Sequence, residues 1–208
     1  MHHVELSFPV FGRELPKDHA YALYSAISKL LDNHLPEGIA ISSIGGRTFW
    51  SGTTPGAGER HLRIRTPVES IGQLLPLAGQ FLEIEGAEIG LGTPRIYALQ
   101  PCANLKSRFV TIKGFTEPQP FLDAVRRQLD RLEISGQASL PVIKSGARKG
   151  EACRRILKIK EKRVVGYSLI IQHLSDADSY HLLAVGLGGR RHMGCGIFVP
   201  IRDGEDRP

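Results

Sequence analysis

Residues 60–69 read Arg-His-Leu-Arg-Ile-Arg-Thr-Pro-Val-Glu and join a strand pattern directly to a helix start. Leu62 and Ile64 alternate with basic side chains, which is the period of a strand with one buried face. The threonine and the glutamate have the spacing of a capping box, and proline occupies the first helical position. The stretch therefore predicts a strand followed at once by a helix, which ends before Gly79.

The elements around this stretch complete a β-α-β-β-α-β order in the first half of the chain. Alternating apolar residues predict a strand at 3–10, and a helical apolar face predicts a helix at 18–31 with Asp18 as its N-cap. Further strands are expected at 38–43 and 80–85. This order is the one found in ferredoxin-like domains.

The second half repeats the order. Residues 107–114 predict a strand, and Thr116-Glu117-Pro118 begins a helix with Phe121, Leu122, Val125, Leu129 and Leu132 inward and Arg126, Arg127 and Arg131 outward. A hairpin is expected from strands at 156–160 and 164–171, with a turn at 161–163. A helix from a Ser175 cap to about Val185 and a strand at 196–201 complete the set.

Together these elements predict an α+β protein built from two tandem ferredoxin-like domains (βαββαβ, the topology also seen in RNA-recognition motifs). A chain of 208 residues can bury a core in each of two such domains. We expect the domains at 1–86 and 105–208, with 87–104 as the connection. Gly45–Gly58 is predicted to be a hairpin tip, and Leu140–Glu151 an exposed, charged loop.

Positive charge is concentrated in one segment. The whole chain has a formal net charge of +6, whereas residues 144–163 hold nine Lys and Arg against two Glu, a local net of +7. A basic loop and strand face favour a polyanionic partner, above all RNA, although a solvated lysine-rich face is the alternative for any single residue. The candidate phosphate-binding residues of this segment are Arg148, Lys149, Arg154, Arg155, Lys158 and Lys160.

A glycine-rich stretch at 186–198 surrounds a second basic cluster. Glycine lets the backbone approach a ligand closely, so the N–H groups around Gly188 and Gly189 are candidates for a phosphate cradle. The alternative is that these glycines only end a helix and allow close backbone packing. A dinucleotide site is not favoured, because such a loop follows a strand and opens a helix, whereas this one follows a helix. The side chains of the cluster are Arg190, Arg191 and His192.

The remaining composition predicts neither a disulfide framework nor a metal site. The three cysteines, Cys102, Cys153 and Cys195, are far apart and have no metal-ligand spacing, so no metal and no cofactor is expected. No apolar run reaches the length of a membrane span, and the N-terminus lacks the pattern of a signal peptide. A reducing cytoplasm is the expected location, with no membrane partner.

Three segments of the sequence resemble one protein family. Residues 15–26, 108–115 and 186–200 are similar to the CRISPR-associated endoribonucleases of the RAMP superfamily that process precursor crRNA, in particular to their myxobacterial-type subgroup. The resemblance covers essentially the whole chain. It implies metal-independent cleavage, in which the 2′-hydroxyl of the scissile nucleotide attacks the adjacent phosphate and leaves a 2′,3′-cyclic phosphate and a 5′-hydroxyl. It also implies CRISPR repeat RNA and mature crRNA as partners, and other subunits of an effector complex as further ones.

The resemblance also suggests which residues act. His34, just after the first helix, best matches the family's acid/base histidine, and His19 at the helix start is the second candidate. Tyr24 is a candidate for orienting the scissile nucleotide, and Lys113 for neutralising phosphate. Without the resemblance, either histidine is more commonly a surface or capping residue. Two other functions stay open: a non-catalytic crRNA-hairpin-binding subunit of the effector complex, and an unrelated two-domain RNA-binding protein.

Overall fold

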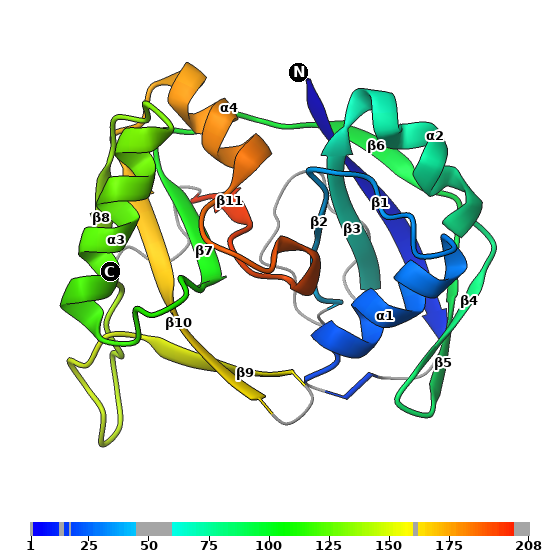
Figure 1. Cartoon of the computed structure of the whole chain (residues 1–208), viewed down its shortest axis with the longest axis horizontal. Helices are drawn as coiled ribbons and strands as arrows, with labels where there is room; N and C mark the ends of the chain where they lie inside the picture. The colour runs from blue at the N-terminus through cyan, green and yellow to red at the C-terminus, as the bar shows by residue number, and fades with distance from the viewer. Residues whose placement is uncertain (1, 13–14, 17, 45–59, 160–161, 202–208) are drawn as a thin grey trace. The chain divides into compact units, whose positions relative to one another are not determined.

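The computed structural model describes residues 2–12, 15–16, 18–44, 60–159 and 162–201. The chain forms two compact units (Figure 1). The first comprises Met1–Leu99 together with Arg191–Gly194, and the second comprises Gln100–Arg190 together with Cys195–Pro208. Four residues from near the end of the chain thus belong to the first unit.

The first unit is built on an antiparallel sheet with strand order β2-β3-β1-β5-β4, to which β6 adds by pairing with β1. The strands predicted at 3–10, 60–65 and 80–85 are confirmed, with bounds shifted by a few residues. The strands are β1 (His3–Gly12), β2 (Ala40–Ile41), β3 (Arg60–Pro67), β4 (Phe81–Ile84), β5 (Ala87–Leu91) and β6 (Arg95–Ala98).

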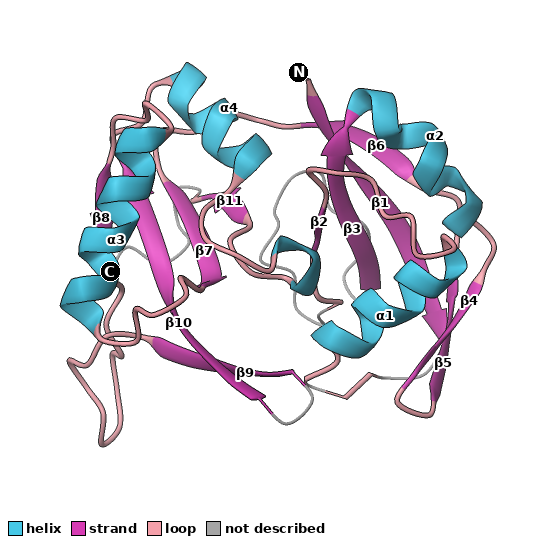
Figure 2. Cartoon of the chain, viewed as in Figure 1, coloured by secondary structure: helices cyan, strands magenta, loops and turns pink. Residues whose placement is uncertain are grey.

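One face of this sheet holds the apolar core. Helix α1 (Ala20–Leu30) lies over this face of the sheet (Figure 2). Its residues Leu23 and Ile27 belong to one buried cluster with Leu6 and Phe8 of β1. Alternation sends the other side chains of the strands to the opposite face. That face carries the polar residues described below, so the core fixes which side of the sheet is available for function.

The start of α1 differs from the prediction. The N-cap position is His19 rather than Asp18, and its side chain makes no capping hydrogen bond. The expected cap failed because the helix begins one residue later than the sequence pattern suggested. The imidazole of His19 instead makes hydrogen bonds to the backbone of Pro16 and Ile44.

The helix predicted after β3 is broken into three short pieces. Pro67 still pairs with His3 of β1, so the strand extends over the expected capping box. Pro76 then interrupts the α-helical hydrogen bonding, because proline has no N–H to donate. The pieces are a 3₁₀ turn at Val68–Ser70, α2 (Ile71–Leu74) and a 3₁₀ turn at Leu75–Leu77.

The expected connection between the halves contains two strands of the first sheet. Within 87–104, β5 pairs with β1 and β4, and β6 pairs with β1. The physical reason is visible in β5, where Ala87, Ile89 and Leu91 are buried and Glu88 is exposed. This alternation of period two is a strand pattern that the sequence analysis did not use.

The second unit has an antiparallel sheet with order β11-β7-β10-β8, and β9 pairs with β10. Helices α3 (Pro118–Arg131) and α4 (Asp176–Val185) contribute buried residues such as Phe121 and Leu182. The phenol ring of Tyr167 in β10 packs on Phe121 with ring centroids 4.9 Å apart. The strands are β7 (Leu105–Val110), β8 (Gln137–Ser139), β9 (Arg154–Ile159), β10 (Lys162–Gln172) and β11 (Phe198–Pro200).

Most predictions for the second unit are confirmed. The hairpin is β9–β10, although Lys162 and Arg163 belong to β10 rather than to the turn. Ser175 caps α4 by accepting a hydrogen bond from the Asp178 amide at 3.1 Å. The predicted hairpin tip at 45–58 lies outside the described residues. Residues 160–161 of the β9–β10 turn lie outside them as well.

Candidate functional site

An aromatic contact joins α1 to the late segment of the first unit. The imidazole of His192 packs on the ring of Tyr24, with ring centroids 4.6 Å apart and planes inclined by 36°. Tyr21, three residues earlier on α1, lies 6.4 Å from Tyr24 and continues the row, as expected for i, i+3 neighbours on a helix. All three rings are half-buried. The structure therefore brings together two predicted site residues from distant parts of the sequence.

Arg191 makes a second contact between the segment 191–194 and the rest of the first unit. Its Nη1 donates to the carbonyl oxygen of Gly38 at 3.5 Å. Burial lowers the pKa of this guanidinium to about 10, and repulsion from Arg65 adds to the shift. Arg65 is buried on β3 and donates to Glu5 at 3.1 Å, and Arg63 lies 3.8 Å from the same carboxylate. A desolvated arginine cluster therefore lies beside the His192–Tyr24 contact.

His19 is a buried residue with both ring nitrogens hydrogen-bonded. Nδ1 donates to the carbonyl oxygen of Pro16 at 2.6 Å, and Nε2 accepts the amide of Ile44 at 3.1 Å. This arrangement requires the neutral tautomer with its proton on Nδ1. Such an imidazole holds two loops together and has no nitrogen left for a substrate proton, so the geometry favours a structural role.

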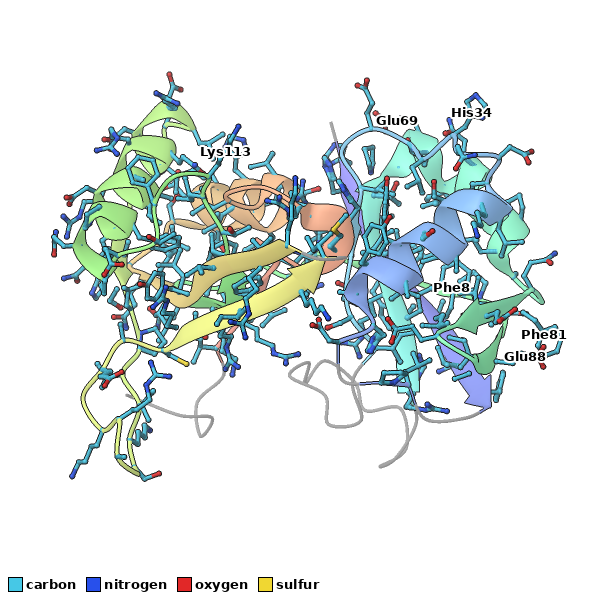
Figure 3. All side chains as sticks on the ribbon, turned by 60° about the horizontal axis from the view of Figure 1, so that its bottom comes forward. Phe8, His34, Glu69, Phe81, Glu88 and Lys113 are labelled. Atoms are coloured by element: carbon cyan, nitrogen blue, oxygen red, sulfur yellow. The ribbon has the colours of Figure 1, made fainter. Side chains whose placement is uncertain are left out.

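His34 is exposed on the turn that follows α1. Figure 3 shows its side chain pointing away from the ribbon of the first unit. Asp32 and Asn33 have positive φ angles, and the Asn33 amide donates to the carbonyl oxygen of Ser28 at 2.8 Å. The turn holds the backbone, while the imidazole is accessible to a ligand.

The basic residues of the second unit divide into paired and accessible ones. Arg148 pairs with Glu151 at 2.7 Å, both being exposed, whereas Lys149 is exposed in the same loop. On β9 the residues alternate, so the side chains of Arg154 and Lys158 lie on one face and that of Arg155 on the other. Lys160 lies outside the described residues.

The glycine-rich segment differs from the predicted phosphate cradle. The amide of Gly188 donates to Oε1 of Gln128 at 2.9 Å, and the amide of Gly189 donates to the carbonyl oxygen of Thr111 at 3.0 Å. Both N–H groups therefore already donate hydrogen bonds within the protein. The glycines serve close packing instead, because a Cβ at Gly188 would collide with the Thr111 carbonyl oxygen.

Two cations near this segment keep accessible side chains. Arg190 is exposed and adopts a positive φ of 61°. Lys113 is exposed in the turn between β7 and α3, and it is labelled in Figure 3. Both are candidates for binding phosphate by their side chains rather than by the backbone.

Arg108 on β7 was not among the predicted site residues. Partial burial lowers the pKa of its guanidinium, and repulsion from Arg155 lowers it further. Its side chain is exposed between the buried residues Ser107 and Phe109.

The described part of the chain holds neither a metal-binding cluster nor a membrane-spanning helix. Among residues 2–12, 15–16, 18–44, 60–159 and 162–201, no three His, Cys, Asp or Glu side chains are grouped so that they could hold a metal ion. In the same part of the chain, every helix is too short or too polar to cross a bilayer.

Comparison with known proteins identifies the family. Residues 4–203 match the Cas6 family, described as Cas6 Crispr. The chain is 38% identical over 201 residues to the CRISPR-associated endonuclease Cas6 of Myxococcus xanthus (strain DK1622), covering 95% of this chain and 81% of the relative.

Solved structures agree in fold. A Cas6-related protein from Pyrococcus furiosus superposes with a TM-score of 0.65 at 16% identity, covering 97% of this chain and 99% of that one. A Cas6 substrate mimic complex gives a TM-score of 0.52 at 15% identity, with 95% and 98% covered. The chain therefore belongs to the Cas6 family of CRISPR-associated endonucleases and has their tandem ferredoxin-like fold.

Proposed function

We propose that this Cas6 chain cuts precursor CRISPR RNA within its repeats by a metal-independent transesterification and then retains the product hairpin in an effector complex. The 2′-oxygen forms a bond to the adjacent phosphorus while the bond from phosphorus to the 5′-oxygen breaks. The proton of the 2′-hydroxyl passes to a base, and the departing 5′-oxygen takes a proton from an acid. The products are a 2′,3′-cyclic phosphate and a 5′-hydroxyl.

The observation that carries this proposal is the 38% identity to a named Cas6 endonuclease over 95% of the chain. The match covers 95% of the chain and therefore reaches both units. The basic strand face of the second unit supplies the electrostatic attraction that an RNA substrate requires.

We assign the acid/base role to His34, because its imidazole is exposed on a fixed turn. His19 is assigned a structural role, since both of its nitrogens are hydrogen-bonded. Tyr24 orients the scissile nucleotide, and its ring is held by His192. The cations that hold the RNA backbone are Arg148, Lys149, Arg154, Arg155, Lys158, Lys160, Arg190, Arg191 and Lys113.

The test is cleavage of a labelled repeat RNA by the purified full chain in EDTA, alongside RNA with a 2′-deoxy sugar at the cut. We expect cleavage to persist in EDTA, to stop with the deoxy sugar, and to leave a 2′,3′-cyclic phosphate. A requirement for Mg²⁺, or cleavage of the deoxy substrate, would refute the mechanism.

The same assay separates the enzyme from a binding subunit. Tight binding of the repeat hairpin without cleavage, under all of these conditions, would assign the chain the non-catalytic role. Retention is tested by mixing labelled product hairpin with the protein and following its release after dilution. Rapid release would contradict that part of the proposal.

A further inference from the structure

The register between β7 and β10 shifts at Ser168. Val110 pairs with Tyr167 and Ser107 pairs with Leu169, so Arg108 and Phe109 of β7 lie opposite the single residue Ser168. Such an irregularity re-aims side chains, and it is over-represented next to functional sites. Here it brings the Ser168 hydroxyl to the backbone of Arg108, whose carbonyl oxygen accepts its hydrogen bond at 2.8 Å.

The same hydroxyl holds Arg155 of β9. Nε of Arg155 donates to Oγ of Ser168 at 2.9 Å, and this bond occupies only one of the five guanidinium N–H groups. In the β9–β10 pairing Arg155 lies opposite Gly166, two residues before Ser168, so the two side chains share one face of the sheet. Ser168 therefore orients Arg155 through Nε, and the two terminal nitrogens of the guanidinium take no part in this bond.

Arg108 and Arg155 thus lie on either side of Ser168 on three neighbouring strands. Partial desolvation lowers the pKa of Arg108, and repulsion between the two guanidiniums lowers it further. A protein gains nothing in stability from holding two like charges close together. Two forked donors in this arrangement match the oxygens of a single phosphate.

We propose that Arg108 and Arg155 form a clamp for one phosphodiester of the RNA and that Ser168 is the positioning residue of this clamp. The proposal rests on the proposed function for the identity of the ligand. RNA is favoured over an acidic protein because forked guanidinium donors match the oxygens of a phosphodiester, and because β9 carries further exposed cations, Arg154 and Lys158, on its other face.

The experiment measures binding of the full chain to repeat RNA with a 2′-deoxy sugar at the cut, which binds without being consumed. For Arg108→Ala we expect about a 10-fold higher Kd and a salt-dependence slope smaller by about one phosphate contact. Arg155→Ala should raise Kd and reduce the salt-dependence slope by similar amounts. The matched control is Arg126→Ala on α3, which removes an equal charge from an exposed pair with Asp123 and should leave Kd within about 2-fold.

Two further measurements identify the ligand group and the role of Ser168. Repeat RNAs that each carry a single methylphosphonate, at successive positions, identify the phosphate that is bound. At one position the increase in Kd caused by the methylphosphonate and that caused by Arg108→Ala should not add, because both remove the same contact. Ser168→Ala should raise Kd by a few-fold with an unaltered salt slope, since both charges stay, and Ser168→Thr should restore binding because it keeps the hydroxyl.

Each outcome bears on one proposal or on both. Unchanged Kd and salt slope in Arg108→Ala, with normal cleavage by the wild type, overturn the clamp and leave the proposed function. The expected binding losses in a protein that does not cleave the unmodified repeat support the clamp and overturn the enzyme. Wild-type protein that binds no repeat RNA overturns both. Losses that are equal at every methylphosphonate position would also overturn a clamp for one phosphate.

Discussion

The imidazole of His192 packs on the ring of Tyr24, and this contact fixes a four-residue segment from the end of the chain onto the first unit. An aromatic pair of this kind contributes about 0.5–1.5 kcal/mol beyond the area that it buries. The contact is thus strong enough to influence where Arg191 and His192 present their side chains.

Replacing Tyr24 by alanine should loosen the segment 191–194. We expect faster amide hydrogen exchange in the peptide that contains it, while Tyr24→Phe keeps the ring and should exchange like the wild type. Equal protection in both variants would show that the ring contact does not hold the segment.

His34→Ala should lower the single-turnover cleavage rate in EDTA by about 100-fold or more, because acid/base groups contribute about that much. The affinity for the 2′-deoxy hairpin should change little, since the imidazole is exposed. His181→Ala, an exposed histidine on α4, is the control. A His34 variant with normal turnover would remove this residue from the mechanism.

His19→Ala should destabilise the protein rather than slow its chemistry. The Ile44 amide loses its acceptor and the Pro16 carbonyl loses its donor, which costs about 1–3 kcal/mol where the groups are buried. Urea unfolding of the full chain measures the loss. Lost turnover with an unaltered free energy of unfolding would instead indicate that His19 is a catalytic residue.

Arg191→Lys should make RNA binding sensitive to pH. Burial lowers the pKa of a cation, so its positive charge is present below that pKa and is lost as pH rises through it. The arginine, with a pKa of about 10, stays charged up to pH 9. A lysine starts near 10.4, and an equal shift brings it to about 8, so its charge would be lost within the working range.

Binding of the 2′-deoxy repeat RNA between pH 7 and pH 9 provides the measurement. The Arg191→Lys variant should lose affinity over this range while the wild type does not. Arg190→Lys, at an exposed position, is the control and should stay constant. A flat profile for both variants would mean that the charge at position 191 does not contribute to binding.

Gly196→Ala should prevent stable folding of the second unit. Gly196 has a φ of 66°, and a Cβ there would overlap the carbonyl oxygen of Leu187, so a methyl group requires the backbone itself to move. We expect a loss of about 3 kcal/mol or more by thermal or urea unfolding. Gly189→Ala is the matched control, because a Cβ there meets nothing within 4 Å. Equal stability of the two variants would contradict the packing role of this segment.

Much of the fold could be predicted because strands and helices follow the period of their apolar residues. Leu62 and Ile64, or Phe121 and Val125, specify one buried face each by local spacing alone. The prediction was wrong at Pro67, where pairing with His3 extends the strand over the expected first helical position. Tertiary pairing outweighed local propensity at that point.

The site was less predictable, since its contacts join residues that are distant in sequence. Neither the stacking of His192 on Tyr24 nor the two hydrogen bonds of His19 leaves a local pattern. The amides of Gly188 and Gly189 were expected to be available, but whether a backbone N–H has an acceptor depends on Gln128 and Thr111. Arg108 was missed because it lies at the register shift between β7 and β10, which depends on pairing between distant strands.

Membership of residues 191–194 in the first unit has a consequence for biosynthesis. The ribosome delivers the first ninety-nine residues long before these four emerge. The unit that is translated first therefore reaches its final packing only after residue 194 has left the exit tunnel.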